Sequence, residues 1–410
     1  MLDVHAITMD IHDKRIAGKR LPSKEFKFVG KLRQQQKKAA EELMRFDTGV
    51  LCASTAFGKT VVASYIIAKR KVNTLILVHR TQLLEQWVAR LSAFLGRDID
   101  TIGRVGGGKK QVTGNVDVTM IQSLHTKGQV DDIVADYGQV IVDECHHLGA
   151  ASFETVISRS KAKYVLGLSA TVTRQDGHHP IIFMQCGPVR FKVDDRQQAK
   201  ERPFSHRVLV RRTSFALPKE LASSENLKIY DLYRTLSEDE VRNVMIVTDV
   251  LSVVKQKRNP VIITERTGHL DRLSELLKPH VQHLIVLRGG MGAKQRRDID
   301  SRLKQIPMNE PRVLIATGKY LGEGYDDIRL DTLFLCLPIS WKGTVAQYAG
   351  RLHRLNEMKK EVVIYDYLDD KVPMLLKMFG KRQRGYRAIG YDMMESDDTE
   401  ILTPKLDFGE

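Results

Sequence analysis

The sequence predicts an α/β protein with two tandem domains, each built on a parallel sheet flanked by helices. Its 410 residues are enough for two to three domains of ordinary size. Short, almost wholly apolar segments alternate with amphipathic segments along most of the chain, as expected for parallel strands buried between helices. The alternation stops over a polar stretch near the middle and then begins again. This single interruption predicts two domains of similar size.

Ten apolar segments are the expected strands. They lie at 49–54, 74–79, 116–121, 139–144 and 164–170, and then at 260–265, 283–288, 312–318, 332–338 and 361–367. Between them, segments such as 82–95 carry apolar residues at helical spacing. The expected division is a leader (1–30), a first α/β domain (31–192), a connector (193–240), a second α/β domain (241–372) and a basic, then acidic, tail (373–410).

The composition points to a polyanionic partner and argues against secreted and membrane proteins. Lys and Arg number 65 and Asp and Glu 50, which leaves a net charge of +15. This balance is typical of nucleic-acid binding, although a basic surface without a ligand is compatible with it. The four cysteines are far apart, as in a reduced, intracellular protein. No segment has the roughly 18 apolar residues of a membrane span. We therefore expect a cytoplasmic protein that does not bind membranes.

The segment ASTAFGKT, from Ala53 to Thr60, has the pattern of a phosphate-binding loop. It follows an expected strand and begins an expected helix, whose first backbone N–H groups would face a phosphate. The expected nucleotide contacts are Ala56, Gly58, Lys59 and Thr60. Lys59 would reach the outer phosphates of ATP, and the Thr60 hydroxyl would coordinate Mg²⁺. The alternative is a chance turn, and Ala53 stands where the pattern has glycine.

An acidic pair, Asp143 and Glu144, ends the expected strand 139–144. Because the carboxyl ends of parallel strands meet at one edge of a sheet, we expect the pair beside the phosphate loop. Asp143 would hold Mg²⁺, and Glu144 would orient and deprotonate the attacking water. In isolation the two carboxylates would be compatible with a helix cap.

Together these residues resemble motifs I and II of superfamily 2 helicases of the D-E-x-H type. Further segments resemble the family's other motifs in the expected order: Ia at 77–80, Ic at 119–124, III at 169–171, IV at 264–270, V at 316–326 and VI at 347–354. The resemblance covers roughly residues 31–370, and the Q-x-x-G-R-x-x-R of motif VI is its most specific part. The sequences of the motifs are similar to those of the restriction-subunit and XPB-like branch. They are closest to those of the helicase half of TOTE conflict system proteins.

The resemblance implies that ATP and Mg²⁺ bind between two RecA-like domains. Arg33 and Gln36 would contact the adenine, and Gly324 and Asp326 of motif V would add nucleotide contacts.

Motif VI would supply arginine fingers, which stabilise charge on the transferring phosphoryl group. Arg351 and Arg354 are three residues apart, so on a helix they share one face. Gln347 belongs to the same motif. The alternative is an ordinary solvated basic face.

The resemblance also implies two further groups of residues. The first couples ATP hydrolysis to domain movement and consists of His146, Ser169 and Thr171. The second contacts the backbone of a nucleic-acid strand and consists of Arg80, Thr119, Gln122 and Thr317.

The expected activity is a nucleic-acid-dependent ATPase that acts as a DNA helicase or translocase, with DNA favoured over RNA. The alternatives are an ATP-gated nucleic-acid clamp or sensor, a duplex translocase subunit of a defence or restriction complex, and an RNA helicase. The clamp is disfavoured by the intact set of Lys59, Glu144, Arg351 and Arg354. By resemblance, a nuclease, methylase or primase is a possible partner.

Overall fold

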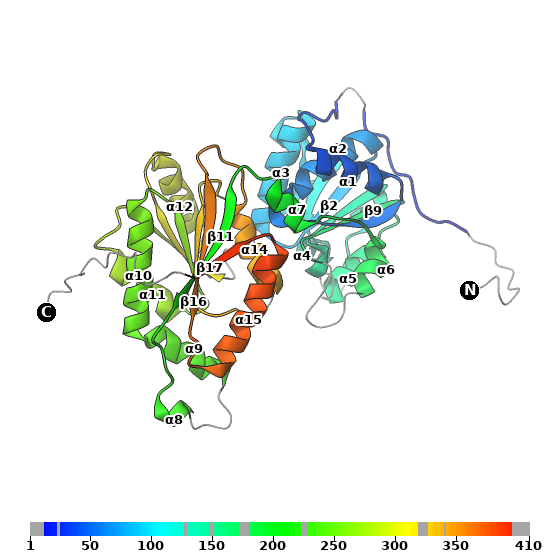
Figure 1. Cartoon of the computed structure of the whole chain (residues 1–410). Coiled ribbons are helices and arrows are strands. Elements are labelled where there is room, and N and C mark those ends of the chain that lie inside the picture. Colours follow the sequence, from blue (N-terminus) through cyan, green and yellow to red (C-terminus); the bar gives the residue numbers. More distant parts are fainter. Residues whose placement is uncertain are drawn as a thin grey trace, which may run out of the picture. The chain divides into compact units, whose positions relative to one another are not determined.

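The structure is a computed structural model that describes residues 12–22, 25–126, 129–147, 151–171, 180–222, 228–318, 327–339 and 342–395. The chain divides into two compact units, unit 1 (Met1–Val193) and unit 2 (Asp194–Glu410). Each unit is an α/β layer structure with its own central sheet (Figure 1). Among the described residues, no helix combines the length and the apolar character needed to cross a membrane.

The sheet of unit 1 has eight strands in the order β10-β1-β9-β8-β2-β5-β3-β4. Their bounds are β1 (Thr48–Cys52), β2 (Thr74–Val78), β3 (Gly103–Gly106), β4 (Lys109–Gln111), β5 (Val116–Met120), β8 (Gln139–Asp143), β9 (Tyr164–Ser169) and β10 (Val189–Lys192). All neighbours pair in parallel except the β3–β4 hairpin at one edge. A separate two-stranded sheet joins β6 (His125–Thr126) and β7 (Gln129–Val130).

Two apolar layers cover the sheet of unit 1. Side chains of α1 (Gln34–Met44), α2 (Lys59–Arg70) and α3 (Thr81–Leu95) pack on one face. Side chains of α4 (Ile121–Leu124), α5 (Ala151–Ser158) and α6 (Pro180–Cys186) pack on the other. Because both faces are covered, every residue of β2 and β8 is buried.

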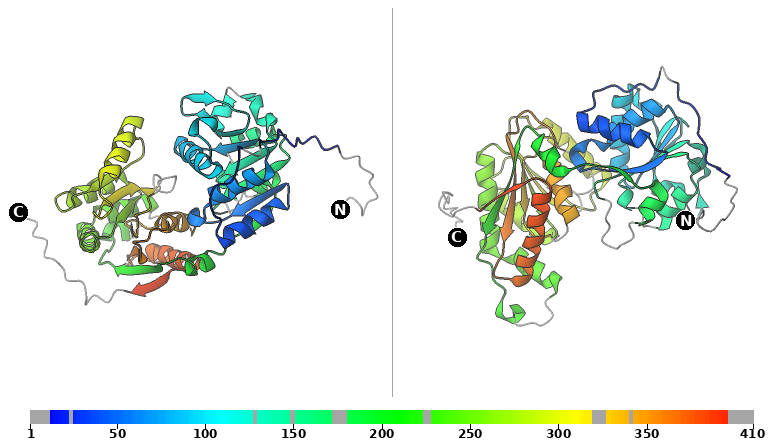
Figure 2. Two further views of the ribbon diagram at one scale, coloured as in Figure 1. Left: turned by 90° about the horizontal axis from the view of Figure 1, so that it is seen from above. Right: turned by 45° about the vertical axis from the view of Figure 1, so that its right-hand side comes forward.

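The sheet of unit 2 has seven parallel strands in the order β13-β14-β12-β15-β16-β11-β17. Their bounds are β11 (Ser205–Arg212), β12 (Pro260–Thr264), β13 (Leu284–Leu287), β14 (Val313–Thr317), β15 (Thr332–Leu335), β16 (Glu361–Leu368) and β17 (Asp392–Glu395). The helices include α7 (Asp195–Lys200), α8 (Lys219–Ala222), α9 (Ile229–Glu238), α10 (Glu240–Lys255), α11 (Thr267–Leu277), α12 (Ala293–Gln305), α14 (Lys342–Leu352) and α15 (Pro373–Ala388). In Figures 1 and 2, α10 and α11 cover one face of this sheet, and α14 and α15 cover the other.

The ten expected strands are all present, with ends that differ by a few residues. The prediction of a connector at 193–240 is wrong in part. Strand β11 of this segment lies inside the second sheet, between β16 and β17. Its sequence, SHRVLVRR, has only three consecutive apolar residues, with cationic residues on both sides, and therefore lacks the longer apolar run of the predicted strands. Arg207 and Arg211 of this strand pair with Glu361 and Asp249, which allows cations within the sheet.

The two ends of the chain also differ from expectation. In the expected tail, α15 and β17 belong to unit 2, and Phe379 and Tyr386 are buried in its core. Residues 396–410 lie outside the described part. In the expected leader, Leu21 and Phe26 are buried in the core of unit 1, so the described part of this segment belongs to that unit.

Candidate active site

The phosphate loop connects β1 to α2 through one turn of 3₁₀ helix at Thr55–Phe57. Gly58 precedes α2 with φ 88° and ψ 45°, a left-handed conformation that side chains other than glycine rarely adopt. A Cβ atom at Gly58 would lie 2.6 Å from the Nε2 atom of Gln36. Both the backbone conformation and the lack of space therefore require glycine at the position where the sequence predicts it.

Lys59 is the first residue of α2, and its side chain is only 7% exposed. Its Nζ atom donates a hydrogen bond to the carbonyl of Ala53 at 3.1 Å and lies 3.6 Å from Oε1 of Glu144. The ammonium is thus held between the loop and the acidic pair. This confirms that the loop and the pair lie together at the carboxyl ends of β1 and β8.

Arg33 and Gln36 support the phosphate loop from the start of α1. Both side chains donate to the carbonyl of Phe57, Gln36 through Nε2 at 2.7 Å. The Gln36 side chain also accepts from the backbone N–H of Arg33 at 2.9 Å. Arg33 makes a further, long contact of 3.5 Å with the carbonyl of Ala56. The structure therefore gives these two residues a role in holding the loop, in addition to the adenine contact expected from the sequence.

Asp143 is buried and hydrogen-bonded to a tryptophan, whereas Glu144 is half-buried. Oδ2 of Asp143 accepts a hydrogen bond from Nε1 of Trp87 at 2.7 Å. Burial and the neighbouring Glu144 carboxylate raise the pKa of Asp143 to about 6. Glu144 itself has φ 49°, a left-handed conformation that is uncommon for residues other than glycine.

Two residues of this site, Trp87 and Arg90, were missed by the sequence reasoning. Nη1 of Arg90 lies 3.5 Å from the Thr60 hydroxyl, at the start of α2. Both residues are on α3, three positions apart, and so share the helix face that meets the phosphate loop. That spacing is the signal in the sequence that could have found them.

A chain of close polar contacts joins Glu144 to the end of β9. Nδ1 of His146 lies 3.2 Å from Oε2 of Glu144 and 2.9 Å from the Ser169 hydroxyl. The Ser169 hydroxyl donates to the carbonyl of Thr171 and accepts from its backbone N–H at 3.2 Å. Because β8 and β9 are neighbours, the three residues expected to couple hydrolysis to movement lie together beside Glu144.

The expected nucleic-acid contacts of unit 1 are not all on the surface. Gln122 is exposed and donates through Nε2 to the carbonyl of His79 at 3.1 Å, and Arg80 is half-buried before α3. Thr119, in contrast, is fully buried in β5, between the neighbouring strands β2 and β3. The expectation for Thr119 is therefore wrong, because its position in a central strand keeps its side chain from a bound strand.

In unit 2, motif residues lie at the carboxyl ends of two adjacent strands. Thr317 ends β14 beside Thr264 and is half-buried. Oε1 of Glu265, just after β12, accepts a hydrogen bond from the Tyr348 hydroxyl of α14 at 3.1 Å. A Cβ atom at Gly318 would lie 2.1 Å from both of these oxygens, so the chain passes them closely. Gly324 and Asp326 lie outside the described residues.

Motif VI begins on α14 and continues past its end. Gln347 and Arg351 are on the helix, half-buried and buried respectively. The helix ends at Leu352, so Arg354 lies beyond it. Nζ of Lys359 donates to the carbonyls of Leu352 and Arg354, both at 2.9 Å, and so caps this helix end. The expectation that both arginines share one helix face is therefore wrong, because the helix stops between them.

Comparison with known proteins agrees with this site. Residues 30–174 match the family model of the type III restriction enzyme res subunit. A protein of Acanthamoeba polyphaga mimivirus named as an ATP-dependent RNA helicase is 25% identical over 403 residues, 95% of this chain and 74% of the relative. The DNA 3'-5' translocase XPB2 of Sulfurisphaera tokodaii is 32% identical over 161 residues, 39% of this chain and 35% of the relative.

A solved structure gives the same result for the fold. The type ISP restriction-modification enzyme LlaBIII, solved bound to DNA, superposes with a TM-score of 0.61 at 16% identity, over 92% of this chain and 32% of that enzyme. These similarities support a superfamily 2 helicase of the restriction-subunit and XPB-like branch. This helicase has the RecA-like α/β fold, hydrolyses ATP, and acts on nucleic acid as a helicase or translocase.

Proposed function

We propose that this helicase uses Mg²⁺-ATP to move along DNA. The observation that carries the proposal is the connected set formed by Lys59, Glu144, His146 and Ser169 at one edge of the unit 1 sheet. It would join a phosphate-binding cation, a general base and a route for coupling within one group of polar contacts. The net charge of +15 supports a polyanionic track.

The residues around Asp143 fit a divalent cation. Two carboxylates, of Asp143 and Glu144, are adjacent, and their mutual repulsion is part of what raises the pKa of Asp143. A nearby Mg²⁺ would favour the ionised form of Asp143. Thr60 and Asp143 are the residues that would hold the ion, and the ion would neutralise charge on the phosphate oxygens.

Three residues of unit 1 would then act on ATP. Lys59 exchanges the carbonyl of Ala53 for phosphate oxygens, since an ammonium gains more from a charged partner than from a carbonyl. Glu144 orients the attacking water and accepts its proton. His146 keeps the carboxylate of Glu144 in place through its contact with Oε2.

We propose that unit 2 completes the site. Arg351 and Arg354 would neutralise charge on the transferring phosphoryl group, with Gln347 beside them on α14. Gly324 and Asp326 would add nucleotide contacts. Arg33 and Gln36 would contact the adenine while they hold the loop.

The proposed strand contacts are Arg80, Gln122 and Thr317. Each is at least partly exposed and follows the carboxyl end of a strand or lies at that end. They would contact the strand backbone, so binding would depend on salt and little on sequence.

The choice of DNA is supported by the 32% identity with a DNA translocase over 161 residues, 39% of this chain. The second candidate is RNA, favoured by the mimivirus relative that matches 95% of this chain. Further alternatives concern the output and the partners of the ATPase. They are a duplex translocase, an ATP-gated clamp, and a complex with a nuclease, methylase or primase.

We also propose a reducing compartment, the cytoplasm. The four cysteines, at positions 52, 145, 186 and 336, are all buried and none forms a disulfide.

The test is steady-state ATP hydrolysis with no nucleic acid, single-stranded DNA, duplex DNA and single-stranded RNA. We expect stimulation by DNA that is lost in Glu144→Gln and kept in Glu154→Gln, a matched change at an exposed residue of α5. Stimulation by RNA alone would overturn the choice of DNA. Turnover unchanged by any nucleic acid would contradict the motor.

A second assay separates two outputs of the motor. Strand displacement from a partial duplex reports unwinding, whereas displacement of a third strand from a triplex reports translocation on duplex. We expect the first to depend on ATP and to be lost in Glu144→Gln. Activity on the triplex alone would identify a duplex translocase.

A further inference from the structure

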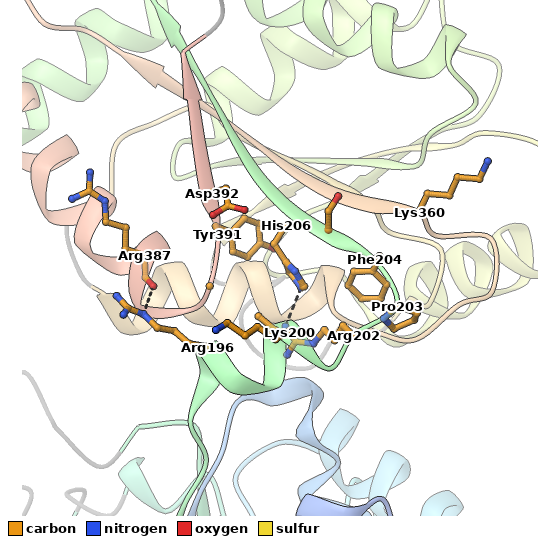
Figure 3. Close-up of a pocket in the computed structure, with 13 residues that line it drawn as sticks. Arg196, Lys200, Arg202, Pro203, Phe204, His206, Lys360, Arg387, Tyr391 and Asp392 are labelled. Atoms are coloured by element: carbon orange, nitrogen blue, oxygen red, sulfur yellow. Dashed lines mark hydrogen bonds between the residues drawn. The ribbon is translucent and has the colours of Figure 1, made fainter.

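A basic pocket of about 670 Å³ lies at the amino ends of three adjacent strands of unit 2 (Figure 3). Ser205 begins β11, Lys360 directly precedes β16, and Tyr391 directly precedes β17. Because these strands are parallel neighbours, their amino ends meet at one edge of the sheet. Helix α7 and the turn after it complete the wall. We call this the amino-edge pocket.

Five cationic side chains and one acidic side chain line the amino-edge pocket. The cations are Arg196, Lys200, Arg202, Lys360 and Arg387, and the acid is Asp392. All except Arg202 are exposed. Within the described part of the chain, Lys200, Lys360 and Arg387 have no ion pair that would neutralise them. The pocket therefore presents a concentrated positive charge to solvent.

The backbone around these cations is held together from distant parts of the chain. Nε of Arg196 donates to the carbonyl of Arg387 at 2.7 Å, which ties α7 to the end of α15. Gly390, with φ 81°, lies so close to Ala199 that a Cβ atom there would approach it to 2.6 Å. The arrangement is thus built into the fold of unit 2.

Arg202 contacts two neutral side chains. It donates to Oε1 of Gln198 at 3.0 Å and contacts Nε2 of His206 at 3.2 Å. Burial and the charge of Arg202 lower the pKa of His206 to about 4, so the imidazole is neutral near pH 7 and accepts this bond. These two bonds help to fix the guanidinium at the pocket wall.

The amino-edge pocket is separate from the helicase motifs IV and V. Glu265 and Thr317 lie at the carboxyl ends of β12 and β14, whereas the pocket is at the amino ends of the sheet. Its floor does reach motif VI, because Nε2 of His353 is 2.8 Å from the Tyr391 hydroxyl. Test variants are therefore placed among the exposed cations at the rim of the pocket and not among the buried aromatic residues of its floor.

We propose that the amino-edge pocket binds backbone phosphates of a nucleic-acid strand outside the helicase motifs. Several separated, solvent-facing cations suit a polyanion better than a single small anion. The aromatic floor residues Phe204 and Tyr391 are buried, so they offer no exposed ring for stacking on a base. Recognition would then be independent of sequence. The inference rests on the proposed action on nucleic acid and adds a contact to it.

The test compares two double variants of the full chain. Lys200→Gln/Lys360→Gln removes two rim cations, and Lys255→Gln/Lys278→Gln removes two exposed lysines away from the pocket. Binding of a labelled DNA strand is measured across a series of salt concentrations without ATP. We expect the rim variant to bind every sequence more weakly, with a salt slope that falls by about 1 for each lysine. We expect the control to match the wild type.

The same variants separate nucleic acid from nucleotide as the ligand. In the ATPase assay, we expect the rim variant to need more DNA for half-stimulation, with an unchanged KM for ATP. A raised KM for ATP with unchanged DNA binding would overturn the proposal in favour of a nucleotide. Salt slopes equal to the control would also overturn it. Failure of the proposed function is a different result, in which the wild type itself neither binds nor responds to nucleic acid.

Discussion

Buried charges occur in both units, but they differ in how fully they are hydrogen-bonded. In unit 2, the Arg382 guanidinium contacts both carboxylate oxygens of Asp366, at 2.8 and 2.9 Å, and both residues are at most 2% exposed. In unit 1, Lys59 is 7% exposed but lies 3.6 Å from Glu144 and hydrogen-bonds a loop carbonyl. The bidentate pair leaves little room for another partner, whereas the lysine can exchange its partners for a ligand.

The difference separates a structural charge from a functional one. Arg242 and Asp369 follow the pattern of Arg382, since they are fully buried and bonded at 3.0 Å, with the carbonyl of Cys336 as a further acceptor. We infer that the saturated pairs of unit 2 hold its helices to its sheet. The loose contacts of unit 1 are those that ATP would replace.

Among the tests of this difference, the largest effect is expected at Lys59. Lys59→Ala removes the cation that we propose to bind phosphate, and we expect ATP hydrolysis to fall by at least about 10²-fold. The melting temperature should stay near that of the wild type, because the ammonium is only loosely paired. Hydrolysis is measured at saturating DNA, with Lys69→Ala, at the far end of α2, as the control. A large loss of stability in Lys59→Ala would show that Lys59 is a structural charge, like those of unit 2.

The next effect is expected at Arg382. Arg382→Met leaves Asp366 buried without its cation, which costs about 3–5 kcal/mol of unfolding free energy. The measurement is urea denaturation, and Arg384→Met, an exposed residue of the same helix, is the control. If Arg382→Met were no less stable than Arg384→Met, Arg382 could not be a structural charge.

Acid should weaken unit 2 through its buried histidines. Burial lowers the pKa of His269 to about 3, and its ring is hydrogen-bonded to Thr264 and Asn243, both at 2.9 Å. The unfolded chain binds the proton near pH 6.5 and the folded chain does not, so stability is complete above pH 6.5 and falls below it. The slope is about 1.4 kcal/mol per pH unit for one such histidine.

The check is urea denaturation at pH 7 and pH 5, in which unfolding is monitored by far-UV circular dichroism. His269→Gln should lower stability at pH 7 and flatten the dependence on pH. A pH dependence as steep as that of the wild type would show that another group is responsible.

The smallest effect on ATP hydrolysis is expected at Ser169. Ser169→Ala removes the hydroxyl that joins His146 to Thr171, which costs about 0.5–1.5 kcal/mol of stability. We expect ATP hydrolysis within a few-fold of the wild type and a larger loss of strand displacement. Equal losses in both assays would mean that Ser169 serves hydrolysis itself.

Sequence reasoning found the parts of this protein that depend on local patterns. The ten predicted strands are short, mostly apolar runs, and Gly58 and Lys59 follow the first of them at the spacing of a phosphate loop. It missed β11, because Arg and His flank its three apolar residues and the strand depends on distant carboxylates such as Asp249. It also missed Trp87, whose contact with Asp143 spans 56 positions of sequence.

Motif matching alone also placed some residues wrongly. Thr119 fits motif Ic in sequence, but its side chain is inside the sheet. Arg354 keeps the spacing of motif VI, but the helix ends before it, at a cap formed by Lys359. Spacing along the chain does not specify where a helix stops, since that depends on which side chain reaches its last carbonyls.

The central claim is that unit 1 binds ATP and that arginines of unit 2 are needed to hydrolyse it. The most direct measurement is single-turnover hydrolysis, with ATP affinity measured in parallel, for Arg351→Ala and for the exposed control Lys381→Ala. We predict that Arg351→Ala keeps its affinity within a few-fold and hydrolyses about 10³-fold more slowly, while the control behaves as the wild type. Hydrolysis at the wild-type rate in a folded Arg351→Ala protein would contradict the account.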